Sequence, residues 1–364
     1  MCLTIKIPAG WRKATLQDLV FFQRGYDITK DQQCPGDIPV VSSSGVNSYH
    51  SESKVDCPGV VIGRKGSLGT VHYVAGPYWP HDTTLWSKDL KGNHPRFVYY
   101  FLQTLGLERY DVGNSNPTLN RNHIHALDIT IPNFTLQERI ASILSTYDDL
   151  IENNKQRMTL LEEAARLLYQ EWFVHLRFPG HEHTRITDGV PEGWETKQVK
   201  ELLAKVRRPG KIQKSDYLSD APIPCIDQSR EFIGGYTNQD DAVIDDLPMI
   251  VFGDHTRILK FIDFPFCCGA DGTQLIASSY PEISQEYLYF ALDAIDLSNY
   301  FYARHFKFLK DQYVPIPTKM LVDQFTHVTR PIMKQINVLR QQNHELSNAR
   351  NLLLPRLMSG EIAV

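Results

Sequence analysis

Cysteine is scarce in this sequence of 364 residues, and its spacing suits neither a disulfide scaffold nor a zinc site. No two cysteines form a C-x-x-C pair, and the six stand at Cys2, Cys34, Cys57, Cys225, Cys267 and Cys268. This pattern predicts buried, reduced thiols without a bound metal.

Long apolar runs are also missing. The N-terminus, MCLTIKIPAGW, lacks the apolar core of a signal peptide. No apolar run approaches the roughly 20 residues that a membrane-spanning helix needs. We therefore expect a cytoplasmic chain that does not enter a membrane.

The sequence has no excess of basic residues, since its formal net charge is −4. Residues 1–134 carry 13 basic and 11 acidic side chains, whereas residues 177–317 carry 15 and 21. Any binding of nucleic acid must therefore come from local basic clusters or from a partner that supplies phosphate contacts.

Catalytic motifs are absent. The stretch GRKGSLG (63–69) has neither the G-x-G-x-x-G pattern nor the G-K-[ST] ending of a phosphate loop. His81-Asp82 has no nucleophile or second carboxylate beside it, which favours a hydrogen bond within a loop over acid–base catalysis. His123 and His125 alternate as on a strand face, without further metal ligands. We expect a non-catalytic chain that holds no metal and no cofactor.

Gly and Pro are missing from residues 134–172. Apolar residues recur there at gaps of three and four, from Ile140 to Trp172, which predicts a striped helix about 55 Å long. Thr135 and Glu138 suit a capping box at its start. A helix of this length is typical of a coiled coil, and its apolar stripe needs a partner.

A β-rich segment precedes the long helix. Short runs rich in β-branched and aromatic residues predict strands at 38–42, 59–63, 69–75, 83–87 and 127–132. Residues 96–110 have a helical period instead.

The sequence then repeats itself. PEGWETKQVKELL (191–203) matches PAGWRKATLQDLV (8–20). Later segments match in the same order, namely 249–263 with 60–74, 269–278 with 79–87, 287–297 with 97–107 and 314–317 with 129–132. The last segment repeats the long helix, which favours duplication. Pro331 should kink or split this second helix, and Pro355 should end it or bend its last turn.

Connectivity indicates the direction of the two helices. The second β-rich segment joins the end of one helix to the start of the other, and a unit of its size has a radius of gyration near ~14 Å. Because such a unit does not easily bridge ends about 55 Å apart, the helices should be antiparallel. Asn154 and Asn343 interrupt the stripes, either to set the register or as solvated residues at the margin.

The predicted fold class is α+β, with two β-rich domains separated by a long antiparallel two-helix coiled coil and related by an internal pseudo-two-fold repeat. We divide the chain into head 1 (1–133), the first spacer helix (134–176), head 2 (177–318), and the second spacer helix with a C-terminal tail (319–364).

Polar loops at corresponding places in the two heads are the candidates for recognition, because Arg, Lys, Asn, Gln, Ser and Thr can contact base edges or phosphates. The candidates in head 1 are Ser43, Ser44, Arg64, Lys65, Ser67, His81, Thr83, Thr84, Arg121 and Asn122. The candidates in head 2 are Arg208, Lys211, Lys214, Gln228, Arg230, His255, Thr256, Arg257, Gln274, Arg304 and Lys307. Any single one can instead be a solvated turn residue, whereas the loops taken as paired sets favour contact with DNA.

With the repeat assembled, the chain resembles a specificity subunit of a type I restriction-modification system over nearly its full length. The resemblance rests on P-x-G-W openings at Pro8 and Pro191 and on I-P endings at 131–132 and 316–317. It also rests on QERI (137–140) and LLLPRLMSGEI (352–362).

The resemblance implies a DNA sequence-specificity subunit for a bipartite site in double-stranded DNA. Each head would recognise one half, and the helix pair would set the spacer. Two methyltransferase (modification) subunits would dock on the helices, including the acidic run at Glu162 and Glu163, and bring S-adenosylmethionine. Restriction (translocase) subunits would bring ATP and Mg²⁺.

Two alternatives remain. One is a non-catalytic coiled-coil scaffold whose heads bind protein partners. The other is the specificity half of a fused methyltransferase, which needs a catalytic domain that this sequence lacks.

Overall fold

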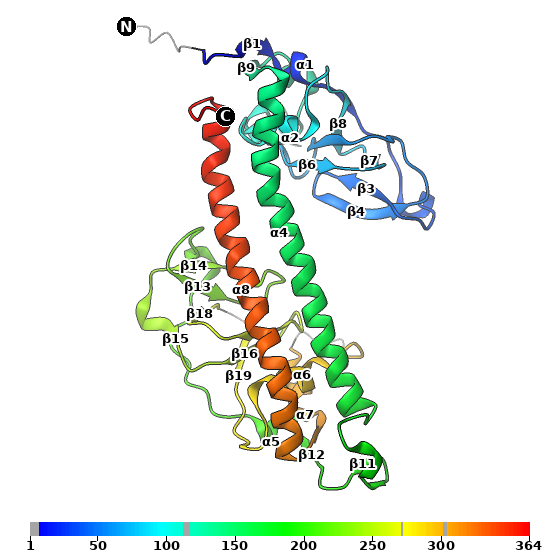
Figure 1. Ribbon diagram of the computed structural model, residues 1–364, viewed down its shortest axis with the longest axis vertical. Coiled ribbons are helices and arrows are strands. Elements are labelled where there is room, and N and C mark those ends of the chain that lie inside the picture. The colour runs from blue at the N-terminus through cyan, green and yellow to red at the C-terminus, as the bar shows by residue number, and fades with distance from the viewer. Residues whose placement is uncertain (1–6, 112–116, 271, 301–303) are drawn as a thin grey trace. The chain divides into compact units, whose positions relative to one another are not determined.

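The computed structural model describes residues 7–111, 117–270, 272–300 and 304–364, and the chain divides into two compact units (Figure 1). Unit 1 comprises Met1–Asn153 and Gln342–Val364, and unit 2 comprises Asn154–Gln341. Each unit therefore contains one β-rich head and a part of both long helices, α4 (Phe134–Tyr169) and α8 (Lys319–Met358). No helix in the described ranges is long and apolar enough to cross a membrane. The fold is α+β, as predicted.

Antiparallel pairing predominates in the sheets of head 1. β1 (Trp11–Thr15) pairs with β9 (Asp128–Pro132). One sheet has the order β2 (Phe21–Arg24), β8 (Thr84–Asp89), β5 (Gly59–Gly63), β6 (Val71–Val74). Another has the order β4 (Gly45–His50), β3 (Ile38–Ser42), β7 (Trp79–Pro80), in which β3 and β7 are parallel. The strands predicted at 38–42, 59–63, 69–75, 83–87 and 127–132 are confirmed as β3, β5, β6, β8 and β9, whereas β1, β2, β4 and β7 were not predicted.

The helices of head 1 are short. They are α1 (Leu16–Leu19), α2 (Pro95–Gln103) and α3 (Arg121–His125), with 3₁₀ turns at Lys30–Gln32 and Leu107–Tyr110. The prediction that His123 and His125 alternate on a strand is wrong, because both lie in α3. The side chain of Asn120 accepts a hydrogen bond from the Asn122 N–H (2.9 Å) and so caps that helix.

The core of unit 1 joins the head to the long helices. Val60 and Ile62 of β5, Phe97 of α2, Leu144 of α4 and Leu357 of α8 belong to one buried cluster. Burial of each such side chain contributes about 1.5–3 kcal/mol. Head 1 is therefore fixed to its own portion of both helices.

Unit 2 contains many short elements. Before the central strands come a π-helical turn (Gln170–Val174), a 3₁₀ turn (His181–His183), β10 (Ile186–Thr187), β11 (Val190–Pro191), β12 (Glu195–Gln198), α5 (Val199–Leu202) and a 3₁₀ turn (Lys214–Asp216). The central elements are β13 (Ile223–Ile226), β14 (Gly235–Thr237), a 3₁₀ turn (Asp240–Ala242), β15 (Val243–Ile244), β16 (Met249–Gly253), β17 (Leu259–Ile262), β18 (Phe266–Cys268) and β19 (Thr273–Ile276). The last elements before α8 are α6 (Gln285–Asp293), α7 (Phe306–Asp311) and β20 (Tyr313–Ile316).

The sheets of unit 2 have the orders β12-β20, β10-β11, β14-β13-β18-β15 and β17-β16-β19. Phe325 of α8 is fully buried in the core of this unit. Ring centroids of Tyr169, Phe173, Tyr287 and Phe290 lie 5.1–6.2 Å from that of Phe325. Aromatic packing therefore fixes head 2 to both helices.

The start of α4 and the continuity of α8 differ from the predictions. α4 is capped by Asn133, whose Oδ1 accepts a hydrogen bond from Leu136 N (3.0 Å), and not by Thr135. Asn133 directly precedes the first helical residue, where a cap must stand. α8 is not split at Pro331 and does not end at Pro355, since it runs unbroken to Met358, so these two alternatives are wrong. The other two, a kink at Pro331 and a bend of the last turn at Pro355, stay predictions. Burial of Thr329, Met333 and Ile336 around Pro331 outweighs the hydrogen bond that proline removes.

Within each unit the two helices run in opposite directions. In unit 1, Asp148 of α4 pairs with Arg350, and the Ile151 carbonyl accepts a hydrogen bond from Asn343 Nδ2 (3.3 Å). In unit 2, Glu162 lies 3.7 Å from Arg340, and the Trp172 ring lies 6.0 Å from that of Phe325. Asn343 therefore bonds across the pair, and Asn154 is buried in unit 2, so neither is a solvated marginal residue.

The cysteines are only partly as predicted. Cys225, Cys267 and Cys268 are buried free thiols, whereas Cys34 and Cys57 are exposed. Cys34 lies in the loop before β3, and Cys57 lies in the loop before β5. Both loops lie at the surface, so these two thiols are not buried. Cys2 lies outside the described residues.

Candidate nucleic-acid interface

Four polar loops of head 1 meet at one place. They follow β3, follow β5, precede β8 and precede α3. Thr83 joins the first three, because its Oγ1 accepts a hydrogen bond from Ser43 N (3.3 Å) and its carbonyl accepts from Arg64 N (2.8 Å) and Lys65 N (3.0 Å). The fourth joins through Leu119, whose N–H donates to the Arg64 carbonyl (2.9 Å). Predicted residues far apart in sequence are thus brought together.

Two side chains hold the loop that follows β3: Thr70, which directly precedes β6, and His72, which lies in β6. The Ser43 carbonyl accepts a hydrogen bond from Thr70 Oγ1 (2.5 Å) and lies 3.1 Å from His72 Nε2. Ser43 is itself buried, while Ser44 and Ser67 are exposed. Gly63 permits the close turn, since a Cβ there would lie 2.0 Å from the Ser67 carbonyl oxygen.

His81 orders the loop before β8. Its Nδ1 lies 3.0 Å from Thr83 Oγ1, and its carbonyl accepts a hydrogen bond from Thr84 Oγ1 (2.6 Å). Thr84 is fully buried, so it supports the loop and offers no surface to a ligand. These loop hydrogen bonds bear out the sequence-based interpretation of His81-Asp82.

Three arginines surround a cavity of about 340 Å³ in this region. Arg24, Arg64 and Arg121 line it with Thr118 and Asn120, and we call it the arginine pocket. Among the residues that the structure describes, Nη1 of Arg64 is buried without a hydrogen-bond partner. Burial, and next the charge of Arg24, lowers the pKa of the Arg64 guanidinium. An anion in the pocket would supply the missing acceptor and relieve the repulsion between the cations.

One acidic side chain lies beside these cations. Asp82 pairs with Arg24 (2.9 Å), and its other oxygen lies 3.2 Å from His81 Nδ1. Asp27, His81 and Asp82 place their potential metal-ligand atoms within 4.8 Å of one another. Since Asp82 and His81 are already engaged with Arg24 and Thr83, we assign no metal to this group.

Four loops of head 2 meet in the same way. They follow β13, follow β16, precede β19 and precede α7. Gln228 accepts hydrogen bonds from His255 N (to Oε1, 3.0 Å) and Thr256 Oγ1 (to its carbonyl, 2.7 Å). Asp254 N donates to the Gly272 carbonyl (2.7 Å), and the Asp254 carbonyl accepts from His305 N (2.8 Å).

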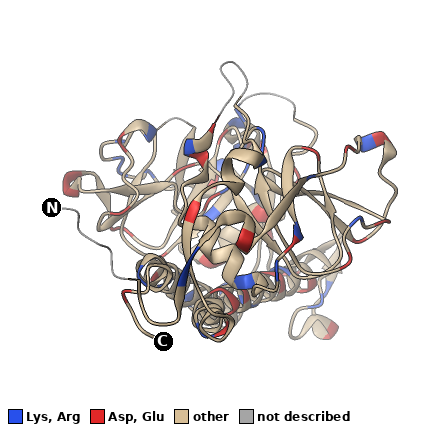
Figure 2. Cartoon of the chain, turned by 90° about the horizontal axis from the view of Figure 1, so that it is seen from above, with Lys and Arg blue, Asp and Glu red and all other residues tan. Residues whose placement is uncertain are grey.

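The predicted cations of head 2 are less gathered than those of head 1. Arg208 Nη2 donates to Gln274 Oε1 (2.9 Å), which brings these two predicted residues together. Arg257 Nη1 donates to the Leu297 carbonyl (3.0 Å), away from the loop cluster. The remaining predicted cations are exposed and are Lys211, Lys214, Arg230, Arg304 and Lys307. Acidic residues are interspersed among the basic ones (Figure 2).

The two heads thus present loops at the same positions in their strand and helix order. β3, β5, β8 and α3 of head 1 correspond to β13, β16, β19 and α7 of head 2. The side chains on these loops differ: Ser43, Arg64 and Thr83 stand in one set, and Gln228, Asp254 and Gly272 in the other.

Some residues of these clusters escaped sequence reasoning. Arg24 lies at the end of β2 and reaches the loop of Asp82, 58 positions later. Thr70 and His72 look like ordinary strand residues, and Lys260 of β17 looks like an exposed lysine although it is 3% exposed. Polar side chains at strand ends were the one available signal. Asn116 and Asp271, which shortly precede the predicted residues Arg121 and Gln274 in the sequence, lie outside the described residues.

The family model and the similar proteins found for this chain carry related descriptions. Residues 8–163 match the family of the type I restriction modification DNA specificity domain. The type I restriction enzyme MjaIX specificity subunit of Methanocaldococcus jannaschii is 24% identical, over 99% of this chain and 95% of the relative. The putative MjaX specificity subunit of the same organism is 22% identical over 68% of this chain and 62% of the relative.

A solved structure has a similar fold. The crystal structure of a type I restriction-modification S subunit from M. genitalium superposes with a TM-score of 0.62 and 15% sequence identity. The match covers 98% of each chain.

Proposed function

We propose that this chain is a type I restriction-modification specificity subunit and that its two heads each recognise one half of a bipartite site in double-stranded DNA. The observation that carries the proposal is the meeting of four polar loops in each head, on matching elements but with different side chains. Matching frameworks with different loops suit two readers of different short sequences.

Within head 1 we assign the arginine pocket to a DNA phosphate. Arg64, with its buried unpartnered Nη1, is suited to an anion, and Arg24 and Arg121 add charge around it. Ser44, Lys65, Ser67, His81, Thr83 and Asn122 are then proposed to lie nearer the bases. Thr84 and Ser43 support their loops.

In head 2 the proposed contacts centre on Gln228, His255, Thr256 and Gln274, with Arg208 beside Gln274. Head 2 is acidic in sum, with 15 basic and 21 acidic side chains in residues 177–317. Its phosphate contacts must therefore come from local cations, for which we propose Lys211, Lys214, Arg230, Arg304 and Lys307; Arg257 is engaged with the Leu297 carbonyl instead.

We further propose that α4 and α8 form one antiparallel coiled coil that sets the spacer between the half-sites, and that the two head-and-helix segments arose by duplication. The opposite directions of the helices within each unit support this. The matching element order of the two heads supports the repeat.

The chain is a non-catalytic subunit that needs no cofactor of its own. We propose that two modification subunits bring S-adenosylmethionine, and that restriction subunits bring ATP and Mg²⁺. Apolar side chains exposed on the long helices are suited to docking such partners, and they include Leu150, Leu160, Leu167, Met320, Val338 and Leu352. Glu162 is engaged with Arg340, so within the acidic run Glu163 is the better candidate for a partner contact.

Selection of duplexes from a random library by the full chain tests the proposal. We expect two short defined sequences separated by a fixed number of unread base pairs. If the full chain enriches no sequence, or one continuous sequence, the proposal is wrong. Failure of the full chain to bind any duplex would favour the scaffold alternative, whose heads bind protein partners.

A further inference from the structure

A buried lysine closes the loop that follows β13. This loop, residues 227–231, carries Gln228 and Arg230, which we assign to DNA. Nζ of Lys260 on β17 donates hydrogen bonds to the carbonyls of Asp227 (2.7 Å) and Glu231 (2.5 Å). One ammonium group thus holds both ends of the loop.

The surroundings of Lys260 make the loop conformation specific. The lysine is 3% exposed, and a carboxylate oxygen of Asp227 lies 3.9 Å from its Nζ. That oxygen also accepts hydrogen bonds from Ser229 N (2.9 Å) and Ser229 Oγ (2.5 Å). Burial lowers the pKa of Lys260 to about 8. A buried cation is costly unless its hydrogen bonds are satisfied, and here the loop carbonyls satisfy them.

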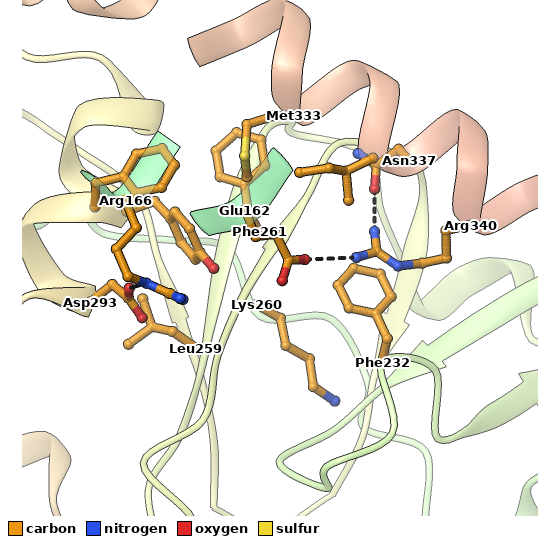
Figure 3. A pocket seen from close by; sticks show the side chains of 13 residues that line it. Glu162, Arg166, Phe232, Leu259, Lys260, Phe261, Asp293, Met333, Asn337 and Arg340 are labelled. Carbon is orange, nitrogen blue, oxygen red and sulfur yellow. Dashed lines mark hydrogen bonds and ion pairs between the residues drawn. The ribbon is translucent and has the colours of Figure 1, made fainter. Parts of the chain in front are cut away.

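A second anchor ties the end of the loop to the long helices. Phe232 follows Glu231 directly, and the guanidinium carbon of Arg340 on α8 lies 3.4 Å from the centre of its ring. Arg340 also lies 3.7 Å from Glu162 of α4 and donates a hydrogen bond to Asn337 (Figure 3).

A cavity of about 160 Å³ lies beside this anchor, lined by Glu162, Arg166, Phe232, Lys260 and Arg340 among others (Figure 3). The charged groups around it are engaged with one another or with the loop, and Arg166 pairs with Asp293 (2.6 Å). The cavity thus lies between the loop and the helices of unit 2.

We propose that Lys260 and Arg340 are positioning residues for base recognition by head 2. Lys260 sets the shape of the loop, and Arg340, through Phe232, ties that shape to α4 and α8 within unit 2. Base discrimination by Gln228 and Arg230 then depends on the arrangement of the helices on which partner subunits are proposed to dock. The inference rests on the proposed function, since it requires that this loop contacts bases.

The test uses Lys260→Met, which keeps the aliphatic stem and removes the ammonium group. The full chain is measured against duplexes that carry every single-base change in either half-site. A good base contact contributes about 1–3 kcal/mol of discrimination. We therefore expect discrimination at the half-site of head 2 to fall about tenfold or more. Discrimination at the half-site of head 1 and the salt dependence of binding should not change.

Two further variants separate positioning from general destabilisation. Arg340→Met should relax the same half-site by a smaller factor, and Arg340→Lys, which keeps a cation near Phe232, should partly restore discrimination. Lys200→Met, at an exposed lysine of α5, is the matched control and should behave like the wild type.

The outcomes are distinct. If the wild-type chain shows no base preference, the proposed function and this inference both fail. If the wild type discriminates and folded Lys260→Met discriminates equally, the inference alone is wrong. If Lys260→Met does not fold, the Arg340 variants decide, and unchanged discrimination in Arg340→Met overturns the inference.

Discussion

Removal of the arginine pocket should make DNA binding less dependent on salt. The side chains of Arg24, Arg64 and Arg121 line one cavity, and Nη1 of Arg64 finds no partner there in the described part of the chain. Each phosphate that a protein neutralises contributes about 0.9 to the slope of log affinity against log salt concentration. Arg64→Gln should therefore lower the slope by about 0.9. The triple glutamine variant should lower it by between about 0.9, for one shared phosphate, and about 2.7, for three.

The magnitude is measurable. Between 50 and 200 mM salt, a slope change of about 0.9 corresponds to a roughly 3.5-fold change in relative affinity. Fluorescence anisotropy of the full chain with a duplex that contains the selected site gives the slope directly. Because phosphate contacts carry no sequence information, the selected sequence should stay the same.

Lys88→Gln provides the control, because Lys88 is an exposed cation toward the opposite end of β8 from the loop cluster. The thermal midpoints of the variants should be compared to exclude unfolding. A slope that stays at the wild-type value in the triple variant would refute the assignment of a phosphate to this pocket. A changed base preference with an unchanged slope would instead place Arg64 on a base.

Three other predictions concern the spacer, the stability and the pH dependence. In the first, seven residues are inserted into each long helix, after Asn153 and after Gln341, where the units meet in sequence. Each helix then grows by about 10.5 Å, so the unread spacer should lengthen by about 3 base pairs. An unchanged spacer in the selected sequences would mean that the helices do not set it. Phe325→Ala should lower the free energy of unfolding by about 3–5 kcal/mol, because this fully buried ring is surrounded by other aromatic rings. Urea denaturation measures the loss, and a loss under about 1 kcal/mol would contradict that packing. His125 Nε2 accepts a hydrogen bond from Phe22 N (3.0 Å), and burial lowers the pKa of this histidine. The folded state therefore binds fewer protons than the unfolded state near that pKa. The free energy of unfolding should then fall as the pH drops below about 6.5. In His125→Gln, which keeps an acceptor but does not titrate, the fall between pH 7.5 and 5 should be smaller than in the wild type, and an equal fall would exclude His125 as its source.

Local patterns in the sequence are strong enough to predict most elements. The runs at 38–42 and 59–63 are strands because each alternates or concentrates β-branched residues between turn residues. The stretch after Pro132 is one helix because it lacks breakers and carries an apolar stripe. A prediction failed where two nearby residues could both take the same role. Asn133 and Thr135 could each cap the start of α4, and Asn133 does so.

The features that the sequence did not predict depend on tertiary packing. A proline in the middle of α8 is tolerated because buried residues on either side hold the helix. Sequence reasoning found the loops of head 1 but not Arg24, because the contact of Arg24 with Asp82 depends on the pairing of β2 with β8. Likewise, nothing local marks Lys260 as buried, since its partners are backbone carbonyls of a loop about 30 residues earlier.

Methylome sequencing tests the central claim most directly. Cells that express this chain with its modification subunits should carry methylation at a split motif, two short defined sequences with a fixed unread gap, and cells without this chain should lack it. Exchange of residues 1–133 for the corresponding head of a relative should change one half of the motif and leave the other half and the gap unchanged. Methylation that does not depend on this chain, or a motif whose two halves change together, would contradict the account.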